Sequence, residues 1–275
     1  MFLYEQITNI LNLKIIQRFA SPENKFICRA KSQSDSENKI SSIFIKGYVK
    51  SIPIRVPVSS LNTENKPNEV FFLEKLKDKG YVPKVIDSIE TELHQYIIME
   101  DLNPEWLDLY TMTETRTCES HFQKIAQNLI RILQELSAEN VHYLDIKPEN
   151  VMIHKKTLNI KLVDFEHAFQ GEFKEINIQI GTIGYLSPET FSGLSYDIKS
   201  AQVFSLGCFL FSCMEMSMPF CQLSDIAKNK MGIFRECSLT LSDLIRKCLC
   251  YKPSDRISFD VLLNHRWFSL EFGYI

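Results

Sequence analysis

The sequence predicts an α+β fold with two lobes, because β-forming runs dominate its first hundred positions and helical apolar spacing dominates the rest. The two kinds of pattern follow each other along the chain and do not alternate. We expect the junction at about Glu100–Pro104, so that residues 1–100 form a strand-rich N-lobe and residues 101–275 form a helical C-lobe. The two lobes together would make one domain.

The N-lobe is expected to be built on short strands. Three runs rich in β-branched and aromatic residues are bounded by polar segments, which is typical of strands. These runs are Phe26–Ala30, Ser42–Lys46 and Tyr96–Met99. Residues 1–19 contain charges and no long apolar run, so we interpret them as a helix or strand and not as a signal peptide.

Polar segments and one helix separate these strands. Ser32–Lys39 predicts a turn, and the asparagine-containing segment Ser59–Asn68 predicts a loop or an insert. Apolar residues then recur at helical spacing over Glu69–Leu76, and Gly80 marks the end of that helix.

Longer apolar patterns predict the helices of the C-lobe. In His121–Ser137 the apolar residues recur every three or four positions, which is typical of a helix with one buried face. Val203–Met214 is nearly all apolar, so it predicts a central helix that is buried on all sides. Ser238–Leu249 and Ser258–Leu263 complete the helical half.

Composition restricts the partners and the location. A net charge of −3 gives no reason to expect nucleic acid or an anionic membrane as a partner. The eight cysteines lack zinc-site spacing, and we interpret them as reduced thiols of an intracellular protein, cytoplasmic or nuclear. Apolar runs stay shorter than the ~18 residues that a membrane-spanning helix needs, so no span is expected.

One cluster of motifs carries the chemistry. Asp145 and Asn150 lie five positions apart in the run Asp-Ile-Lys-Pro-Glu-Asn, and Asp164-Phe165 follows fourteen positions after Asn150. This is the spacing that phosphoryl transfer uses for a base, a metal-binding amide and a metal-binding carboxylate. At these positions the chain resembles the eukaryotic protein kinase family, and the likeness extends over roughly residues 15–270.

The resemblance implies a role for each of these side chains. Asp145 would accept or orient the proton of the substrate hydroxyl, and Lys147 would neutralise charge on the phosphoryl group in transfer. Asn150 and Asp164 would hold Mg²⁺, a cation that prefers oxygen ligands. The cofactors would be ATP and Mg²⁺.

The resemblance also implies an ATP site in the N-lobe and at the junction. Lys46 would hold the α- and β-phosphates and pair with Glu69, 23 positions later. The alternatives are that Lys46 is an ordinary exposed lysine and that Glu69 only favours the start of a helix. The implied ATP-binding residues are Ile27, Phe44, Lys46, Glu69, Met99 as gatekeeper, Glu100 and Leu102 in the hinge, and Met152.

Other motifs point to the substrate. Gly181–Glu189 resembles the substrate-docking loop, with Thr182 inside it, and Glu189 would pair with Arg256. The Lys-Pro-Glu-Asn run is the serine/threonine form, and in basophilic relatives a residue like Glu149 reads an arginine before the phosphoacceptor. Asp108 is a weaker candidate for a second such contact. Within the superfamily the chain is most similar to the PIM kinases, near the calcium/calmodulin-dependent group.

Several positions depart from the family pattern. Residues 18–30 contain no glycine, although a glycine-rich loop would let the backbone approach phosphates closely. Phe44 stands where the family has alanine, and Glu166 replaces the glycine of Asp-Phe-Gly. Leu144 replaces the arginine before the catalytic aspartate, and Gln202 replaces the aspartate of the central helix.

The loss of that arginine has a companion in the activation segment. Between Asp164 and Gly181 the chain has no serine, threonine or tyrosine, so ordinary phosphorylation cannot switch this stretch. If the protein is active, we expect constant activity.

Three functional hypotheses follow. The first is an active serine/threonine protein kinase, because every side chain that would touch phosphate or metal is present. The second is a pseudokinase that binds or scaffolds, favoured by Phe44, Glu166 and the glycine-free loop. The third is a small-molecule kinase of related fold, which the Gly181–Glu189 segment argues against.

Overall fold

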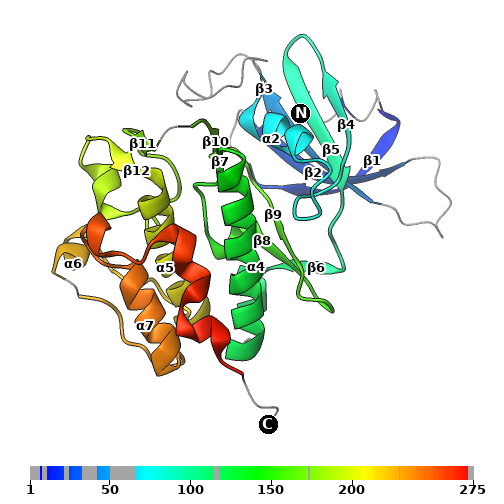
Figure 1. The fold of residues 1–275 in the computed structure, drawn as a ribbon. Helices are drawn as coiled ribbons and strands as arrows, with labels where there is room; N and C mark the ends of the chain where they lie inside the picture. The colour runs from blue at the N-terminus through cyan, green and yellow to red at the C-terminus, as the bar shows by residue number, and fades with distance from the viewer. Residues whose placement is uncertain are drawn as a thin grey trace. The chain divides into compact units, whose positions relative to one another are not determined.

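The computed structural model describes residue 7 and residues 11–21, 25–32, 42–49, 66–113, 118–172, 174–228 and 230–271 (Figure 1). These residues divide into two compact units, the first ending at Pro104 and the second beginning at Glu105. The first unit is strand-rich and the second is mainly helical, which confirms the predicted α+β class. The predicted turn over Ser32–Lys39 and most of the predicted loop over Ser59–Asn68 lie outside the described residues.

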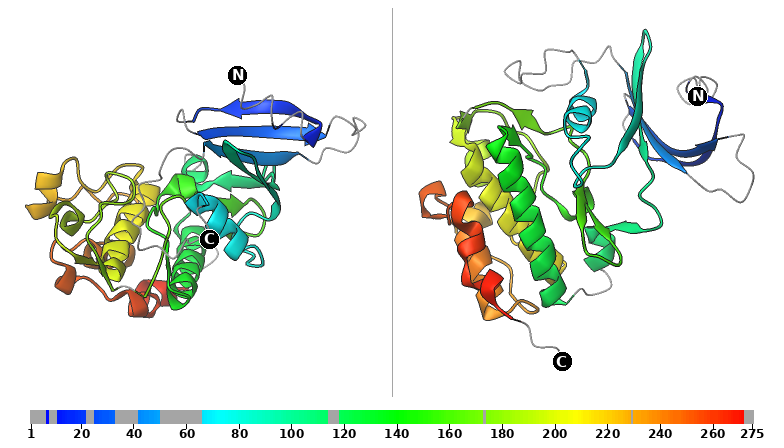
Figure 2. Two further views of the ribbon diagram at one scale, coloured as in Figure 1. Left: turned by 90° about the horizontal axis from the view of Figure 1, so that it is seen from above. Right: turned by 45° about the vertical axis from the view of Figure 1, so that its right-hand side comes forward.

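The first unit is an antiparallel sheet of five strands in the order β1-β2-β3-β5-β4 (Figures 1 and 2). All three predicted strands are present, and the stretch before residue 20 contributes a strand as well. The strands are β1 (Leu13–Phe19), β2 (Lys25–Ser32), β3 (Ile43–Val49), β4 (Val85–Glu90) and β5 (His94–Glu100). The predicted helix is α2 (Asn68–Lys75), so Asn68 begins the helix and does not end the loop.

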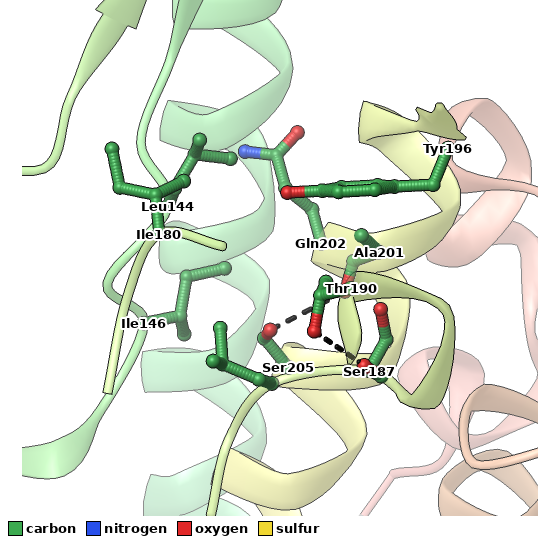
Figure 3. Close-up of a pocket in the computed structure, with 10 residues that line it drawn as sticks. Leu144, Ile146, Ile180, Ser187, Thr190, Tyr196, Ala201, Gln202 and Ser205 are labelled. Atoms are coloured by element: carbon green, nitrogen blue, oxygen red, sulfur yellow. Dashed lines mark hydrogen bonds between the residues drawn. The ribbon is translucent and has the colours of Figure 1, made fainter. Parts of the chain in front are cut away.

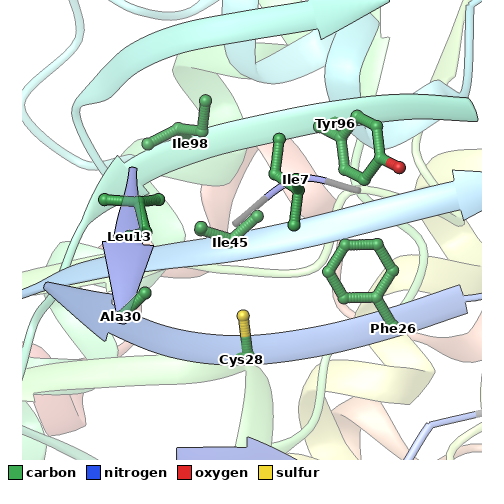
Figure 4. Close-up of a cluster of buried hydrophobic side chains, with 8 residues drawn as sticks. All are labelled: Ile7, Leu13, Phe26, Cys28, Ala30, Ile45, Tyr96 and Ile98. Carbon is green, nitrogen blue, oxygen red and sulfur yellow. The ribbon is translucent and has the colours of Figure 1, made fainter. Parts of the chain in front are cut away.

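The two faces of this sheet differ in their side chains. Successive residues of a strand point to opposite faces, and one face carries a buried apolar cluster (Figure 4). Its members are Ile7, Leu13, Phe26, Cys28, Ala30, Ile45, Tyr96 and Ile98. Gly47 makes room for this cluster, because a Cβ there would lie 1.9 Å from the Phe26 ring. By alternation, Ile27, Phe44 and Lys46 belong to the opposite face.

The second unit is built around long helices. The longest are α4 (Glu119–Ala138), α5 (Ile198–Glu215) and α7 (Leu239–Cys248), which confirm three of the predicted helices (Figure 1). Helix α5 is buried over most of its length, as its apolar composition requires, and the Asp197 carboxylate caps it by accepting from the Ser200 amide. Two shorter helices are α3 (Leu109–Thr113) and α6 (Leu223–Ala227).

Short strands of the second unit position the site. β8 (Val151–His154) lies between β6 (Trp106–Asp108) and β9 (Ile160–Leu162) in a three-stranded sheet. β7 (Val141–His142) pairs with β10 (Phe169–Gln170), and β11 (Glu175–Ile176) pairs with β12 (Tyr196–Asp197). Paired strands therefore flank both acidic residues: β7 and β8 flank Asp145, and β9 and β10 flank Asp164.

The remaining helical segments are short 3₁₀ helices. They are Pro148–Asn150, Pro188–Phe191, Pro253–Asp255, Phe259–Asn264 and Arg266–Ser269. The helix predicted over Ser258–Leu263 is present as the 3₁₀ segment Phe259–Asn264. Across the described segments, every helix is too short or too polar to cross a membrane. All eight cysteines are free thiols.

Candidate active site

Asp145 and Asn150 form the centre of a hydrogen-bonded cluster in the second unit. They flank the start of the 3₁₀ turn at Pro148–Asn150, between β7 and β8. The Asn150 Nδ2 atom donates to Asp145 Oδ2 at 2.9 Å and to the Asp145 carbonyl at 3.0 Å. Both side chains are buried. Because the amide nitrogen is occupied in this way, the amide oxygen of Asn150 remains as the acceptor that a cation could use.

Lys147 and Thr182 also contact the Asp145 carboxylate. The Thr182 hydroxyl donates to Asp145 Oδ1 at 2.6 Å and accepts from Lys147 Nζ at 2.8 Å. Lys147 Nζ also lies 2.8 Å from Asp145 Oδ2. The structure therefore brings three predicted site residues from two distant segments together.

His167 is a site residue that sequence reasoning missed. Its Nδ1 atom lies 3.6 Å from Asp145 Oδ2, and its side chain is 41% exposed. Burial acts to raise the pKa of Asp145, but contacts with His167, Lys147 and Thr182 outweigh it and hold that pKa well below its usual range. The Asp145 carboxylate in turn raises the pKa of His167. A single histidine near Asp-Phe carries no motif that could have revealed this contact.

The backbone around Asp164 places it beside Asn150. The Val163 amide donates to the Asn150 carbonyl at 3.0 Å, so the β8–β9 pairing brings these two segments together. Asp164 has a φ of 63°, in the left-handed region that aspartate tolerates better than most residues. Phe165 is buried, and its ring centroid lies 5.0 Å from that of Tyr143. The Tyr143 hydroxyl donates to the Val163 carbonyl at 2.6 Å.

The oxygen ligands in this region fit Mg²⁺. Mg²⁺ is held by one or two protein carboxylates or amides and takes its other ligands from substrate phosphates and water. Asn150 and Asp164 offer one amide oxygen and one carboxylate. Among the described residues, no group of three or more His, Cys, Asp or Glu side chains could hold a metal ion by itself.

The other predicted residues of the second unit, Met152, Glu149 and Asp108, have differing surroundings. Met152 is half-buried on β8, opposite Asp108 on β6. Glu149 is exposed. Both carboxylate oxygens of Asp108 accept hydrogen bonds from Thr111, at 2.8 Å each, so Asp108 caps the short helix α3.

The first unit contains the predicted lysine–glutamate pair. Lys46 on β3 donates to the Glu69 carboxylate of α2, and both side chains are buried. Lys46 is therefore not an ordinary exposed lysine. The Tyr48 hydroxyl donates to the other oxygen of Glu69, a contact that the sequence did not indicate.

Four predicted ATP-binding residues share one face of the sheet. Ile27 is opposite Lys46 on the neighbouring strand, and Phe44 is opposite Met99, so these four side chains point away from the apolar cluster. Phe44 is half-buried, and its ring centroid lies 5.4 Å from that of Phe19.

The segment that follows β5 carries the predicted hinge. The Glu100 amide donates to the Lys84 carbonyl at 2.9 Å, and its side chain accepts from the Lys84 amide at 2.8 Å. Leu102 is half-buried in the coil after the strand.

The activation segment packs on an apolar cluster around Leu144. Its other buried members are Phe169, Ile176, Tyr196, Ile198 and Ala201. The Tyr196 hydroxyl donates to the Ile178 carbonyl at 2.5 Å, and the β11–β12 pairing holds the same stretch. The leucine that replaces an arginine is thus part of a packed core.

A small cavity lies beside this cluster (Figure 3). Its volume of about 10 Å³ gives room for one water molecule. Gln202 lies on its wall and donates to the Tyr143 carbonyl at 3.0 Å, so it supports the backbone just before Asp145. Ile146 and Ile180 close the cavity on its other side.

Two further contacts fix the docking loop. Gly181 has a φ of 116°, and a Cβ there would lie 2.7 Å from the Leu144 carbonyl, so glycine is required next to Thr182. At the other end, Arg256 Nη1 and Nη2 donate to the two oxygens of Glu189 at 2.5 and 2.7 Å. The predicted Glu189–Arg256 pair is confirmed and is bidentate.

Comparison with known proteins gives consistent matches. Residues 48–268 match the protein kinase domain family. Serine/threonine-protein kinase pim-2 of Danio rerio is 29% identical over 210 residues, which cover 73% of this chain and 68% of that protein. Serine/threonine-protein kinase prk-2 of Caenorhabditis elegans is 29% identical over 219 residues, 75% of this chain and 48% of that protein. The chain thus spans about half the length of the second relative.

Proposed function

This chain belongs to the protein kinase family, and on that premise we propose that it transfers the γ-phosphate of ATP to serine or threonine hydroxyls of protein substrates. The observation that carries the proposal is the cluster in which Lys147, Asn150 and Thr182 all contact the Asp145 carboxylate. Family membership supports protein substrates and the use of ATP. The names of the similar proteins support the serine/threonine type.

Asp145 would orient the substrate hydroxyl and take up its proton. Its depressed pKa keeps the carboxylate charged at neutral pH, so it can always accept a hydrogen bond. Lys147, which already contacts Asp145, would carry positive charge next to the phosphoryl group in transfer. When bound, Mg²⁺ would neutralise phosphate charge, and Asn150 and Asp164 would hold it.

Residues of the first unit would hold the nucleotide. Lys46, fixed by Glu69, would contact the α- and β-phosphates. The surroundings of the base would come from the shared sheet face and the hinge, with Ile27, Phe44, Met99, Glu100 and Leu102. Met152, on β8 of the second unit, is a separate candidate.

The substrate would carry basic residues before its phosphoacceptor. Glu149 is the best candidate to bind these basic residues, because its carboxylate is exposed one position before Asn150. Thr182 would line the same site through its bond to Asp145. Asp108 is a poorer candidate, since Thr111 occupies both of its oxygens.

Activity would not depend on phosphorylation of the activation segment. The stretch from Asp164 to Gly181 has no hydroxyl side chain. Leu144 packs in an apolar cluster with Phe169, Ile176 and Tyr196, which supports an ordered segment without a phosphate.

A pseudokinase is the second candidate function. The contact between Phe44 and Phe19 favours it, because two aromatic rings occupy the sheet face that would receive adenine. Glu166 adds a negative charge two positions after Asp164. Such a protein would keep the fold and bind partners without turnover.

The deciding experiment measures phosphate transfer from radiolabelled ATP to two serine peptides that differ only in an arginine placed before the serine. We expect transfer to the arginine peptide and at least about a hundredfold less with Asp164→Asn, because a lost charge-stabilising group costs that much. Thermal unfolding of Asp164→Asn checks that the variant remains folded. Equal, near-zero transfer by both proteins would favour the pseudokinase, and equal transfer to both peptides would contradict the basic preference.

A further inference from the structure

A buried carboxylate lies at the end of the first unit, just after β5. The Asp101 side chain is 2% exposed. Its Oδ2 atom is 2.5 Å from Arg29 Nε and accepts a hydrogen bond from the Ser42 hydroxyl at 2.5 Å. Its Oδ1 atom accepts from the Asn103 amide at 3.1 Å. A buried charge needs such partners, so this carboxylate has a fixed position.

Arg29 extends this contact to the first two strands. It lies on β2, and its Nη1 donates to Gln17 Oε1 of β1 at 2.7 Å. Its guanidinium also lies 5.7 Å from the centre of the Phe19 ring, at the end of β1. One side chain therefore joins β1 and β2 to the segment 101–103, which is 72 positions further along the chain.

This arrangement occurs on the face proposed to receive the nucleotide. Arg29 is opposite Phe44 in the strand pairing, and both belong to the face of Lys46. Phe19 contacts Phe44 as well, so the end of β1 is held from two sides. Residues 18–30, which include the end of β1 and most of β2, contain no glycine, so close approach of this backbone to phosphates is hindered.

We propose that Arg29 is a positioning residue, which fixes β1 and β2 on Asp101 and thereby sets the affinity for ATP. In this chain, the ion pair would hold β1 and β2 in the position that binds ATP. This fixed position would take the place of the flexible glycine-rich loop that the chain lacks. A charged pair suits this task, because a planar guanidinium held by an ion pair at Nε and a hydrogen bond at Nη1 has a defined orientation. The inference rests on the proposed function, since it concerns the nucleotide of that same site.

The test compares five variants, one of them a control, with the unaltered protein. Arg29→Met and Asp101→Asn each remove one charge of the pair. The double variant removes both, so that no buried charge is left without its partner and folding is preserved. Arg29→Lys keeps the charge but loses the planar geometry. Lys14→Met is the matched control, because Lys14 is an exposed cation on β1.

Two measurements read the result. Amide hydrogen exchange without nucleotide reports on the order of β1 and β2. Titration with Mg-ATP gives Kd, and steady-state kinetics give KM and kcat. In the double variant we expect exchange in β1 and β2 to quicken and Kd for Mg-ATP to rise about tenfold, a 1.4 kcal/mol change. KM should rise more than kcat falls, Arg29→Lys should be intermediate, and Lys14→Met should match the unaltered protein.

Wild-type exchange rates in β1 and β2 of the double variant would overturn the inference, and so would an unchanged Kd. An equal effect of Lys14→Met would also overturn it, because charge alone would then explain the change. Failure of the unaltered protein to bind Mg-ATP would instead remove the proposed function and the nucleotide half of this inference. The exchange rates would still decide whether Arg29 positions the strands.

Discussion

At the scale of single residues, the site depends on the side chains that surround the Asp145 carboxylate. Asp145 keeps its charge because a lysine, an amide, a hydroxyl and a histidine surround it. Of these four, Lys147, Asn150 and Thr182 could be predicted from motifs. His167 could not, because its contact with Asp145 is made across 22 positions and depends on how the chain folds back after Phe165.

Gly181 allows a direct test of how Thr182 is placed. In Gly181→Ala, the new Cβ would meet the Leu144 carbonyl at 2.7 Å, and the positive φ adds strain of about 1–2 kcal/mol. We expect Thr182 to shift away from Asp145 and phosphate transfer to fall at least about tenfold, because small misplacements at a reacting centre cost large factors.

Gly193→Ala is the matched control. Gly193 also has a positive φ, of 71°, but a Cβ there meets nothing within 4 Å. It should lose only the stability that the strain of the positive φ costs, and it should keep its activity. Equal loss of transfer in both variants would show that backbone strain, and not the position of Thr182, is responsible.

His167 predicts a dependence of stability on pH. Its folded-state pKa is raised by the Asp145 carboxylate, so its contribution is fully present below the unfolded pKa of about 6.5 and is lost as pH rises through the folded pKa. The unfolding temperature of the unaltered protein should therefore exceed that of His167→Gln most at about pH 6. The difference should shrink at alkaline pH, and a constant difference would contradict the ion pair.

At the scale of elements, long helices follow from local pattern and short strands do not. α4, α5 and α7 were predicted because each shows a sustained apolar pattern. β7, β10, β11 and β12 have two residues each, too few for any periodicity, and they exist because distant segments pair. The contact of Arg29 with Asp101 has the same origin, since nothing in either local sequence indicates the other.

The Glu189–Arg256 pair should dominate the stability of the elements that it joins. Arg256 is buried, contacts Glu189 through two bonds and also donates to carbonyls of Ser200, Cys250 and Tyr251. Arg256→Met would leave the Glu189 carboxylate without its partner, and we expect a loss of about 3–5 kcal/mol. Denaturant unfolding measures it.

Lys199→Met provides the comparison. Lys199 forms an ion pair with Asp260 at 2.9 Å, but the two side chains are 42% and 66% exposed. Removal of such a surface pair should cost no more than about 1 kcal/mol. Similar losses for both variants would mean that the contribution of the Arg256 pair is overstated.

At the scale of the whole molecule, the fold class and the family follow from the sequence, whereas nucleotide binding needs measurement. The succession of strand and helix patterns predicted the fold class, and the motifs around Asp145 and Asp164 predicted the family. Whether Phe44 and its contact with Phe19 leave room for adenine depends on packing, which no motif encodes.

Thermal unfolding with and without Mg-ATP tests whether the protein binds the nucleotide despite Phe44 and Phe19. A ligand at 100 times its Kd stabilises the folded state by about 2.7 kcal/mol. At ~2–4 °C per kcal/mol, the unfolding temperature should rise by several degrees. The rise should require magnesium if Asn150 and Asp164 hold the metal. No rise with ATP and magnesium would favour the pseudokinase.

The apolar cluster around Leu144 has a consequence for the conditions in which the activation segment stays ordered. A contact between arginine and phosphate is electrostatic, so dissolved ions weaken it. Packing of Leu144 against Phe169, Ile176 and Tyr196 relies on the exclusion of water, which ions hardly disturb but low temperature weakens. The segment of this protein should therefore tolerate concentrated salt and loosen in the cold.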